Sequence, residues 1–322
     1  MESSDQLIGE LLGRKSYRLD GLVLSRSGKP TGLLQPAALF AWDVHRHFVA
    51  QGRRGTATAR DDSIEEVIAA LLAAGALMLG TEEEIGRCRD LLADARTSRS
   101  FAYLCCMVET CGEALASHEK VRAGRVLFLG CGGIGSLAAV SLAGAGVAEI
   151  FLVDADIVEE SNLNRQLLFD LGHTGRPKVD VVREAIAHRF PDVTVSSIVK
   201  TIEAGDVAAL GADANAILLT ADHPLGLPPA IGSIAASKGM FLVHAGYGIA
   251  HGIVKTCPQG EVRWTWHRLA HSVMPSAGPI NLELAGVASN LVLQHLAFDT
   301  ESPRITTGWT GHQYPRQVVL HR

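Results

Sequence analysis

Several features that would assign the chain to a particular class are missing from its sequence. The 322 residues carry a formal net charge of −5 and no basic block, so we expect no nucleic-acid partner and no binding to a membrane surface. The N-terminal stretch has no basic segment followed by an apolar core, and we expect no signal peptide. The longest apolar runs, 67–79 and 137–153, are interrupted by glycine, and the second also by Glu149. These absences argue against a membrane span and favour a globular, cytoplasmic protein.

Cysteine is present, but never in the spacing of a metal site. No two cysteines form a Cys-x-x-Cys pair, and their spacing suits neither a disulfide framework nor a tetrahedral zinc site. We therefore expect no structural zinc and interpret the cysteines as small apolar core residues. They are Cys88, Cys105, Cys106, Cys111, Cys131 and Cys257.

The first eighty residues differ in pattern from the rest of the chain. Residues 17–26 alternate like a strand, and residues 33–52 are predicted to form a helix with Pro36 near its start. Residues 61–80 predict a second helix that ends at a glycine and is followed by a short apolar run. This succession predicts a small winged-helix-like module, which we assign to residues 1–80.

Beyond this module the pattern changes twice. Residues 81–120 predict a helical connector made of one long or broken helix, and residues 121–322 predict an α/β domain. Alternating strands and helices favour a mostly parallel sheet covered on both faces, with ligands beyond the carboxyl ends of its strands. The predicted strands are 125–130, 149–154, 193–199, 214–222 and 239–246, with helices at 134–146 and 177–190.

The motif LFLGCGGIGS at residues 127–136 predicts a strand, a glycine turn and a helix. Gly130, Gly132 and Gly135 have the G-x-G-x-x-G spacing, in which the glycines allow a tight turn, a close approach of a phosphate and close helix–strand packing. The helix N-terminus then offers free N–H groups. Asp154, nineteen residues after Gly135, ends the next strand and can accept hydrogen bonds from a ribose. This pattern fits NAD as well as ATP.

Polar residues downstream favour ATP over a dinucleotide. A triphosphate carries nearly four negative charges, and its cleavage needs cations and amide donors around the β- and γ-phosphates. Asn162 could donate hydrogen bonds from its amide, Arg165 could bind in a bidentate way through its guanidinium, and Lys178 would act as a point charge. A dinucleotide fold has no need of these residues, together with Gln166, after its second strand.

A resemblance to a known family lies in three motifs, LGCGGIGS, VDADIVEESNLNRQ and GRPKV. They resemble the ubiquitin-activating-type adenylyltransferases of the ThiF/MoeB superfamily. Within it, TADHPLGL at residues 220–227 and HAGYGIAHG at residues 244–252 are similar to the branch of microcin C peptide adenylyltransferases. The resemblance covers most of the chain and is strongest over 125–260. It implies a Rossmann-like, mostly parallel sheet with an N-terminal winged-helix peptide clamp.

The resemblance also implies roles for individual residues. Asp222 would help to hold Mg²⁺. In a homodimer, Arg99 of one subunit would reach the γ-phosphate of the ATP bound by the other subunit, with Arg96 as second candidate. Asp154 would hold the ribose. The ATP phosphates would be surrounded by Gly130, Gly132, Gly133 and Gly135, and the triphosphate would be lined by Asn162, Arg165, Gln166 and Lys178.

The sequence departs from the family where most relatives bind zinc and some carry a catalytic cysteine. The first zinc pair would fall near residues 263–268 and the second near the C-terminus, and neither place has a cysteine. The loop at 268–281, which would carry an acyl-accepting cysteine, has none, so transfer to a thiolate is not expected. We interpret Cys131 and Cys257 as structural.

These observations predict an ATP- and Mg²⁺-dependent adenylyltransferase that acts on the C-terminal end of a ribosomally made precursor peptide. Three alternatives stay open from the sequence alone. One is activation of a side-chain carboxylate that leads to peptide cyclisation or dehydration. The others belong to different classes: an NAD-dependent oxidoreductase, and a peptide-binding partner protein without catalytic activity.

Overall fold

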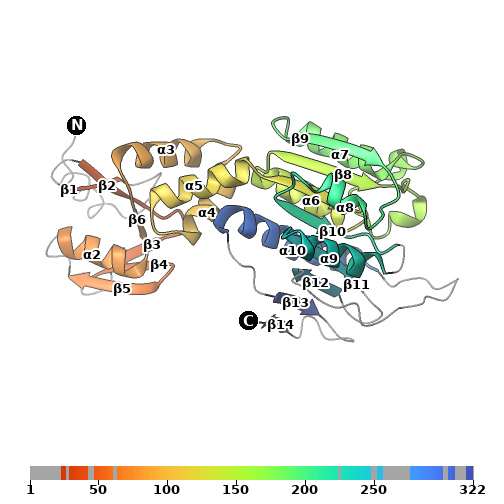
Figure 1. Cartoon of the computed structure of the whole chain (residues 1–322). Helices are drawn as coiled ribbons and strands as arrows, with labels where there is room; N and C mark the ends of the chain where they lie inside the picture. The colour runs from red at the N-terminus through yellow and green to blue at the C-terminus, as the bar shows by residue number, and fades with distance from the viewer. Residues whose placement is uncertain are drawn as a thin grey trace. The chain divides into compact units, whose positions relative to one another are not determined.

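The computed structural model describes residues 23–26, 29–42, 47–60, 64–223, 226–247, 252–256, 276–299, 304–308 and 317–321. The chain divides into two compact units, Met1–Glu119 and Lys120–Arg322, which we describe separately (Figure 1). None of the described helices combines the length and the apolar character that crossing a membrane requires.

The first unit contains two three-stranded antiparallel sheets. One has the order β1-β2-β6, with strands Val23–Arg26, Lys29–Leu34 and Leu77–Leu79, and the other has the order β3-β4-β5, with strands Leu39–Trp42, His47–Gly52 and Gly55–Arg60. Helix α2, Ile64–Ala74, packs its apolar side against buried residues of both sheets. Gly75, with φ +67°, ends this helix as predicted.

The predicted helix at residues 33–52 is wrong, because this segment forms parts of β2, β3 and β4. Phe48 and Ala50 are buried while their neighbours are less so, which is the period-two pattern of a strand. Pro36 lies in the turn between β2 and β3 instead of in a first helical turn.

The predicted helix over residues 81–120 is confirmed in its broken form. It consists of α3 (Glu82–Ala93), α4 (Ser98–Met107) and α5 (Cys111–Arg122), the last of which runs into the second unit. Asp94 makes the first break, since its carboxylate accepts the N–H groups of Arg96 and Thr97. Cys88, Cys105 and Cys111 are buried free thiols in this region.

The second unit is built on a six-stranded sheet in the order β12-β11-β10-β7-β8-β9. All neighbouring strands are parallel except β11 and β12, so the predicted mostly parallel α/β fold is confirmed. The strands are β7 (Arg125–Leu129), β8 (Glu149–Asp154), β9 (Thr194–Val199), β10 (Ala216–Leu219), β11 (Leu242–Tyr247) and β12 (Gly252–Thr256).

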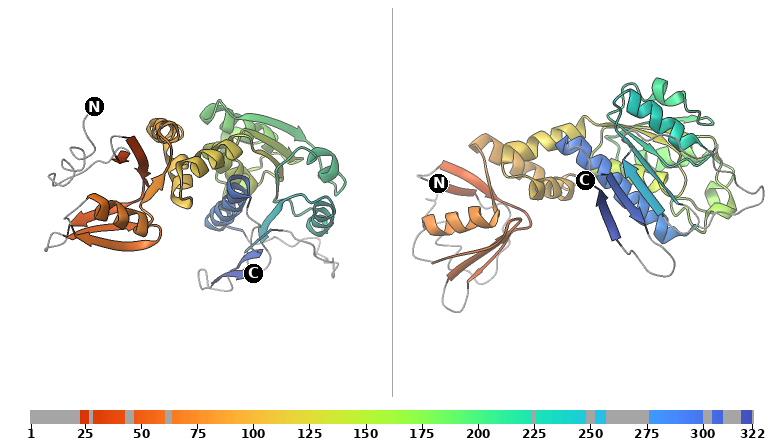
Figure 2. Two further views of the ribbon diagram at one scale, coloured as in Figure 1. Left: turned by 60° about the vertical axis from the view of Figure 1, so that its left-hand side comes forward. Right: turned by 60° about the horizontal axis from the view of Figure 1, so that its bottom comes forward.

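Helices cover both faces of this sheet. Leu127 and Leu129 of β7 pack with α8 (Asp206–Leu210) and α9 (Leu227–Ser237) on one face. The alternate β7 residues point to the other face, where α6 (Gly135–Ala145) contacts α7 (Lys178–Arg189) and α10 (Gly278–Phe298). Figure 2 shows the hairpin of β13 (Arg304–Gly308) and β14 (Gln317–His321) beside β12.

The strand order reverses between β7 and β10. From β7 the chain moves outward through β8 to β9, and it then returns to the other side of β7 as β10 and continues to β11. The carboxyl ends of β7 and β10 therefore lie at a topological switch point, where ligands of such sheets bind.

Candidate active site at the glycine turn

The glycine turn lies at this switch point and is held by close backbone contacts. Gly130 has φ +106°, and a Cβ there would lie 2.7 Å from the Ala221 nitrogen and from Thr220 Oγ1. The Thr220 hydroxyl donates to the Gly130 carbonyl at 2.9 Å. A Cβ on Gly135 would overlap that same carbonyl. The two glycines thus let the ends of β7 and β10 and the start of α6 meet, as their spacing predicts.

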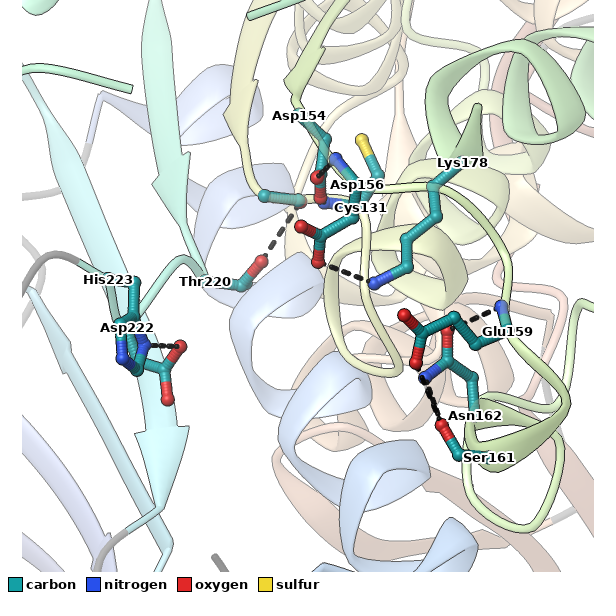
Figure 3. Close-up of polar contacts among 11 residues, drawn as sticks. Cys131, Asp154, Asp156, Glu159, Ser161, Asn162, Lys178, Thr220, Asp222 and His223 are labelled. Carbon is teal, nitrogen blue, oxygen red and sulfur yellow. Dashed lines mark hydrogen bonds and ion pairs between the residues drawn. The ribbon is translucent and has the colours of Figure 1, made fainter. Parts of the chain in front are cut away.

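Asp154, at the end of β8, ties the turn to its neighbouring strand (Figure 3). Its Oδ2 accepts the Cys131 N–H at 2.6 Å and its Oδ1 accepts the Asp156 N–H at 2.8 Å. Burial raises the pKa of Asp154, while these two hydrogen bonds and the Lys178 ammonium act in the opposite direction. A carboxylate has about four lone-pair sites, so capacity remains for a ribose hydroxyl.

Lys178 provides a buried cation beside this carboxylate. It is the first residue of α7, its side chain is 6% exposed, and Nζ donates to Asp156 Oδ2 at 2.8 Å. Figure 3 shows the lysine side chain extending from α7 toward Asp156. An ammonium has three N–H donors, so the hydrogen bond to Asp156 leaves the other N–H groups of Lys178 available for an anion.

The segment after β8 carries the other predicted triphosphate ligands. Asn162 is buried, and its Oδ1 accepts the Glu159 N–H at 3.1 Å. Arg165 is half-buried, and its guanidinium donates to the Ser161 carbonyl at 2.7 Å and to Asn164 Oδ1 at 3.0 Å. Both bonds use one guanidinium nitrogen, Nη1, so donors on the other nitrogens remain for a phosphate.

Three buried polar atoms near the glycine turn have no hydrogen-bond partner in the described part of the chain. They are Ser136 Oγ, Gln166 Oε1 and Asn281 Oδ1. The Gln166 amide faces the turn, since a Cβ on Gly132 would lie 3.9 Å from Nε2. Buried polar groups are almost always paired, so these atoms point to a ligand or ordered water. The residues present therefore fit a bound polar molecule.

Asn281 is a site residue that sequence reasoning missed. It lies in the first turn of α10, and its Nδ2 donates to the Arg165 carbonyl at 3.0 Å. The only available signal was an amide within an otherwise mostly apolar helical segment, and that signal carries no information about which turn the helix packs against.

Asp222 and its neighbour His223 follow β10 and are exposed, with 3.2 Å between Asp222 Oδ1 and His223 Nδ1. In Figure 3 the pair is separated from the group around Lys178. No cluster of three or more His, Cys, Asp or Glu side chains occurs within the described ranges. Mg²⁺ commonly takes one or two carboxylates together with substrate phosphates, and a single exposed aspartate fits that mode.

The remaining sequence-predicted positions lie elsewhere. Arg99 and Arg96 are exposed in the first unit, Arg99 on α4 and Arg96 just before it. Cys131 is buried, and burial raises the pKa of its thiol well above the ordinary value, which agrees with a structural role. Cys257, the zinc-equivalent positions 263–268 and residues 268–275 of the predicted acceptor loop lie outside the described residues.

Comparison with known proteins matches residues 107–262 to the ThiF family. The molybdopterin-synthase adenylyltransferase of Escherichia coli is 35% identical over 106 residues, or 33% of this chain and 43% of that protein. The adenylyltransferase and sulfurtransferase UBA4 of Saccharomyces cerevisiae is 34% identical over 139 residues, or 43% of this chain and 31% of that protein. The match thus spans less than half the length of these curated relatives.

Solved structures extend the likeness of fold to most of the chain. E. coli MccB with ATP superposes with a TM-score of 0.64 at 20% identity, covering 89% of this chain and 96% of that one. The structure of PaaA gives a TM-score of 0.63 at 18% identity, covering 88% and 99%. At these identities the likeness establishes the fold. Residues 107–262, slightly less than half of the chain, are similar to the ThiF family, and the two curated relatives named above are adenylyltransferases.

Proposed function

We propose that the protein is an ATP- and Mg²⁺-dependent adenylyltransferase that activates the C-terminal end of a ribosomally made precursor peptide. The observation that carries the proposal is the composition of the switch-point site. A glycine turn, the buried ammonium of Lys178 and the buried side-chain amide of Gln166 lie there. Asp156 accepts one N–H group of the ammonium, and the others remain for the negatively charged phosphates of a nucleoside triphosphate.

Each described group has a task in this proposal. The N–H groups of the turn and of the first turn of α6 bind phosphate oxygens, as helix N-termini do. The Lys178 ammonium neutralises charge that develops on the leaving phosphates, and Asp154 accepts from the ribose. Asn162 and Arg165 add amide and guanidinium donors. Asp222 would hold Mg²⁺, which supplies charge neutralisation between phosphate oxygens when bound.

The reaction needs little acid–base help from the protein. An oxygen of the peptide carboxylate, or a terminal amide nitrogen that loses its proton, forms a bond to the α-phosphorus. The bond from that phosphorus to the bridging oxygen breaks, and pyrophosphate leaves with the electron pair. Catalysis is then mainly positioning and electrostatic stabilisation.

Two observations support a peptide as the acceptor. The first unit offers antiparallel sheets with edge strands, among them β1, and an extended peptide can add to such an edge. Solved MccB structures of similar fold contain MccA, in one case N-formylated. We therefore assign peptide recognition to the first unit and adenylation to the second, acting in a homodimer.

The test measures pyrophosphate release from ATP and Mg²⁺ with pooled synthetic peptides that cover all twenty C-terminal residues. Each peptide is prepared as a free acid and as a C-terminal amide. We expect release with at least one pool and a product heavier by an adenylyl group. Lys178→Ala should slow the release by about a hundredfold, the usual loss for one electrostatic donor.

Lys120→Ala is the matched control. Lys120 also forms an ion pair, with Asp299, but its side chain is about half exposed, so the change should leave the rate nearly unaltered. Loss of water from the peptide would instead support side-chain activation with cyclisation or dehydration. Binding of NADH without binding of ATP would overturn the proposal in favour of an oxidoreductase.

A further inference from the structure

The contact between α10 and the glycine turn gives one amide an unusual place in the site. Asn281 is 1% exposed, although it is a polar residue on a mainly apolar helix. Gly133 packs directly against it, since a Cβ on Gly133 would lie 2.9 Å from Asn281 Cγ and would overlap Nδ2. The absence of a side chain at Gly133 is thus what admits the Asn281 amide.

The same amide reaches the segment that carries Arg165 and Gln166. Its Nδ2 donates to the Arg165 carbonyl at 3.0 Å, and this carbonyl would itself lie 3.2 Å from a Cβ on Gly133. Next to it, the buried Gln166 amide faces Gly132. One side chain from α10 therefore sits between the phosphate-binding turn and the segment with the proposed triphosphate donors.

The carbonyl half of the Asn281 amide differs from the donor half within the described part of the chain. Asn281 Oδ1 is buried and has no partner among the residues that the structure describes. If Asn281 only packed the core, an apolar residue of similar size would avoid this cost. An asparagine at this position, in spite of the cost of burying its carbonyl oxygen, has a reason if its donor group sets the position of the Arg165 backbone relative to the turn.

We propose that Asn281 is a positioning residue for the triphosphate: it holds the Arg165–Gln166 backbone at a set distance from Gly133, so that the donors of both segments meet one ligand. The proposal rests on the proposed function, since it assigns to Asn281 a share in binding ATP. Asn281 itself touches Gly133 and Arg165 and acts through them. It should matter for the triphosphate more than for adenosine monophosphate, because the segments that it joins carry the triphosphate ligands.

The test compares the affinities of the full chain for ATP and for AMP, with Mg²⁺, by calorimetry. In Asn281→Ala we expect a loss of at least tenfold in ATP affinity and a smaller loss, under threefold, for AMP. Ser289→Ala is the matched control, because Ser289 is a buried polar residue of the same helix whose hydroxyl donates to the carbonyls of Ala285 and Gly286 in its own helix. It should leave both affinities within twofold of the unchanged chain.

A double-mutant cycle tests the contact between Gly133 and Asn281 on which the positioning role depends. Gly133→Ala alone should abolish most ATP binding, because the added Cβ overlaps the amide. In the Asn281→Ala background the same change should cost much less, since the overlapping atoms are gone, and the two losses should be strongly non-additive. Asn281→Ser, which keeps a polar group, replaces Asn281→Ala if the latter shows no cooperative thermal transition.

Two failures can be told apart. Equal losses for ATP and AMP, or additive losses in the cycle, would overturn the positioning role while the unchanged chain still binds ATP. An unchanged chain that binds no ATP would bring down the proposed function and this role with it.

Discussion

At the scale of single residues, Asp154 has a structural and a proposed ligand-binding task at once. Its carboxylate holds the glycine turn by accepting the Cys131 N–H, and it also accepts the Asp156 N–H in the segment that follows β8. Burial, which favours the neutral form, is the largest influence on its pKa and raises it. The carboxylate that would accept a hydrogen bond from the ribose therefore becomes protonated at a higher pH than an ordinary aspartate does.

We predict that acid weakens ATP binding through Asp154 without destabilising the fold through this residue. Because its folded-state pKa is raised, the folded chain binds more protons than the unfolded chain between the two pKa values, so this group's contribution to stability falls as pH rises through that window. A protonated carboxyl loses acceptor capacity, so ATP affinity should fall toward low pH. Calorimetric titrations from neutral pH down to the ordinary aspartate pKa of about 4, with parallel thermal melts, measure both effects.

Asp154→Asn provides the reference, because ATP and other groups also titrate in this range. The variant should bind ATP more weakly near neutral pH and lose affinity less steeply on acidification. Identical pH profiles for the two proteins would show that Asp154 does not contribute to the acid limb.

At the scale of secondary-structure elements, the ends of the connector helices are determined by local side-chain hydrogen bonds. Thr81 and Glu84 form a capping box at the start of α3, in which the Thr81 hydroxyl accepts the Glu84 N–H at 3.3 Å and Glu84 Oε2 accepts the Thr81 N–H at 2.8 Å. At α5, the Glu113 carboxylate accepts the N–H groups of Glu109 and Thr110. Such contacts explain why the helical segment is broken.

We predict that Thr81→Ala lowers the unfolding free energy of the first unit by about 1 kcal/mol, the usual loss for an N-cap. Thr81→Ser keeps the hydroxyl and should retain most of the stability. Urea unfolding followed by circular dichroism on the full chain measures both changes. A serine variant as unstable as the alanine variant would show that the Thr81 methyl group, not the cap, matters.

The element scale also shows where periodicity fails as a guide. Residues 33–52 contain enough apolar residues for a helical face, but antiparallel pairing of β4 with β3 and β5 decides their conformation. Gly52 approaches the Ala74 carbonyl, where a Cβ would lie at 2.7 Å. The strand partners of β4 are its neighbours in sequence and Ala74 lies further along the chain, but apolar spacing within one segment reports neither the pairing nor this contact.

At the scale of the whole molecule, the strand order brings together groups that are far apart in the chain. Thr220 and Gly130 are ninety residues apart yet share a hydrogen bond, because β10 pairs with β7. If the protein is a homodimer with composite sites, as its resemblance to the family implies, Arg99 of one subunit serves the site that Lys178 builds in the other.

This arrangement predicts complementation between two inactive variants. Arg99→Ala and Lys178→Ala are co-expressed with different tags, and the mixed dimer is purified through both. One of its two sites then contains neither substitution, so the pyrophosphate release rate should return to about half of the unchanged value. A purified mixed dimer as inactive as either parent would contradict a trans role for Arg99, and a monomer in light scattering would contradict the dimer.

The sequence by itself determined the α/β domain, the glycine turn and the acid at the end of the second strand, because each depends on spacing within a few tens of residues. The same local information predicted α2 and the broken connector. Only the tertiary structure decided that residues 39–60 pair as strands, that Lys178 is buried against Asp156 and that Asn281 meets Gly133. These outcomes depend on which elements pack together, and the free energy of burial that selects the partners is a property of the assembled fold.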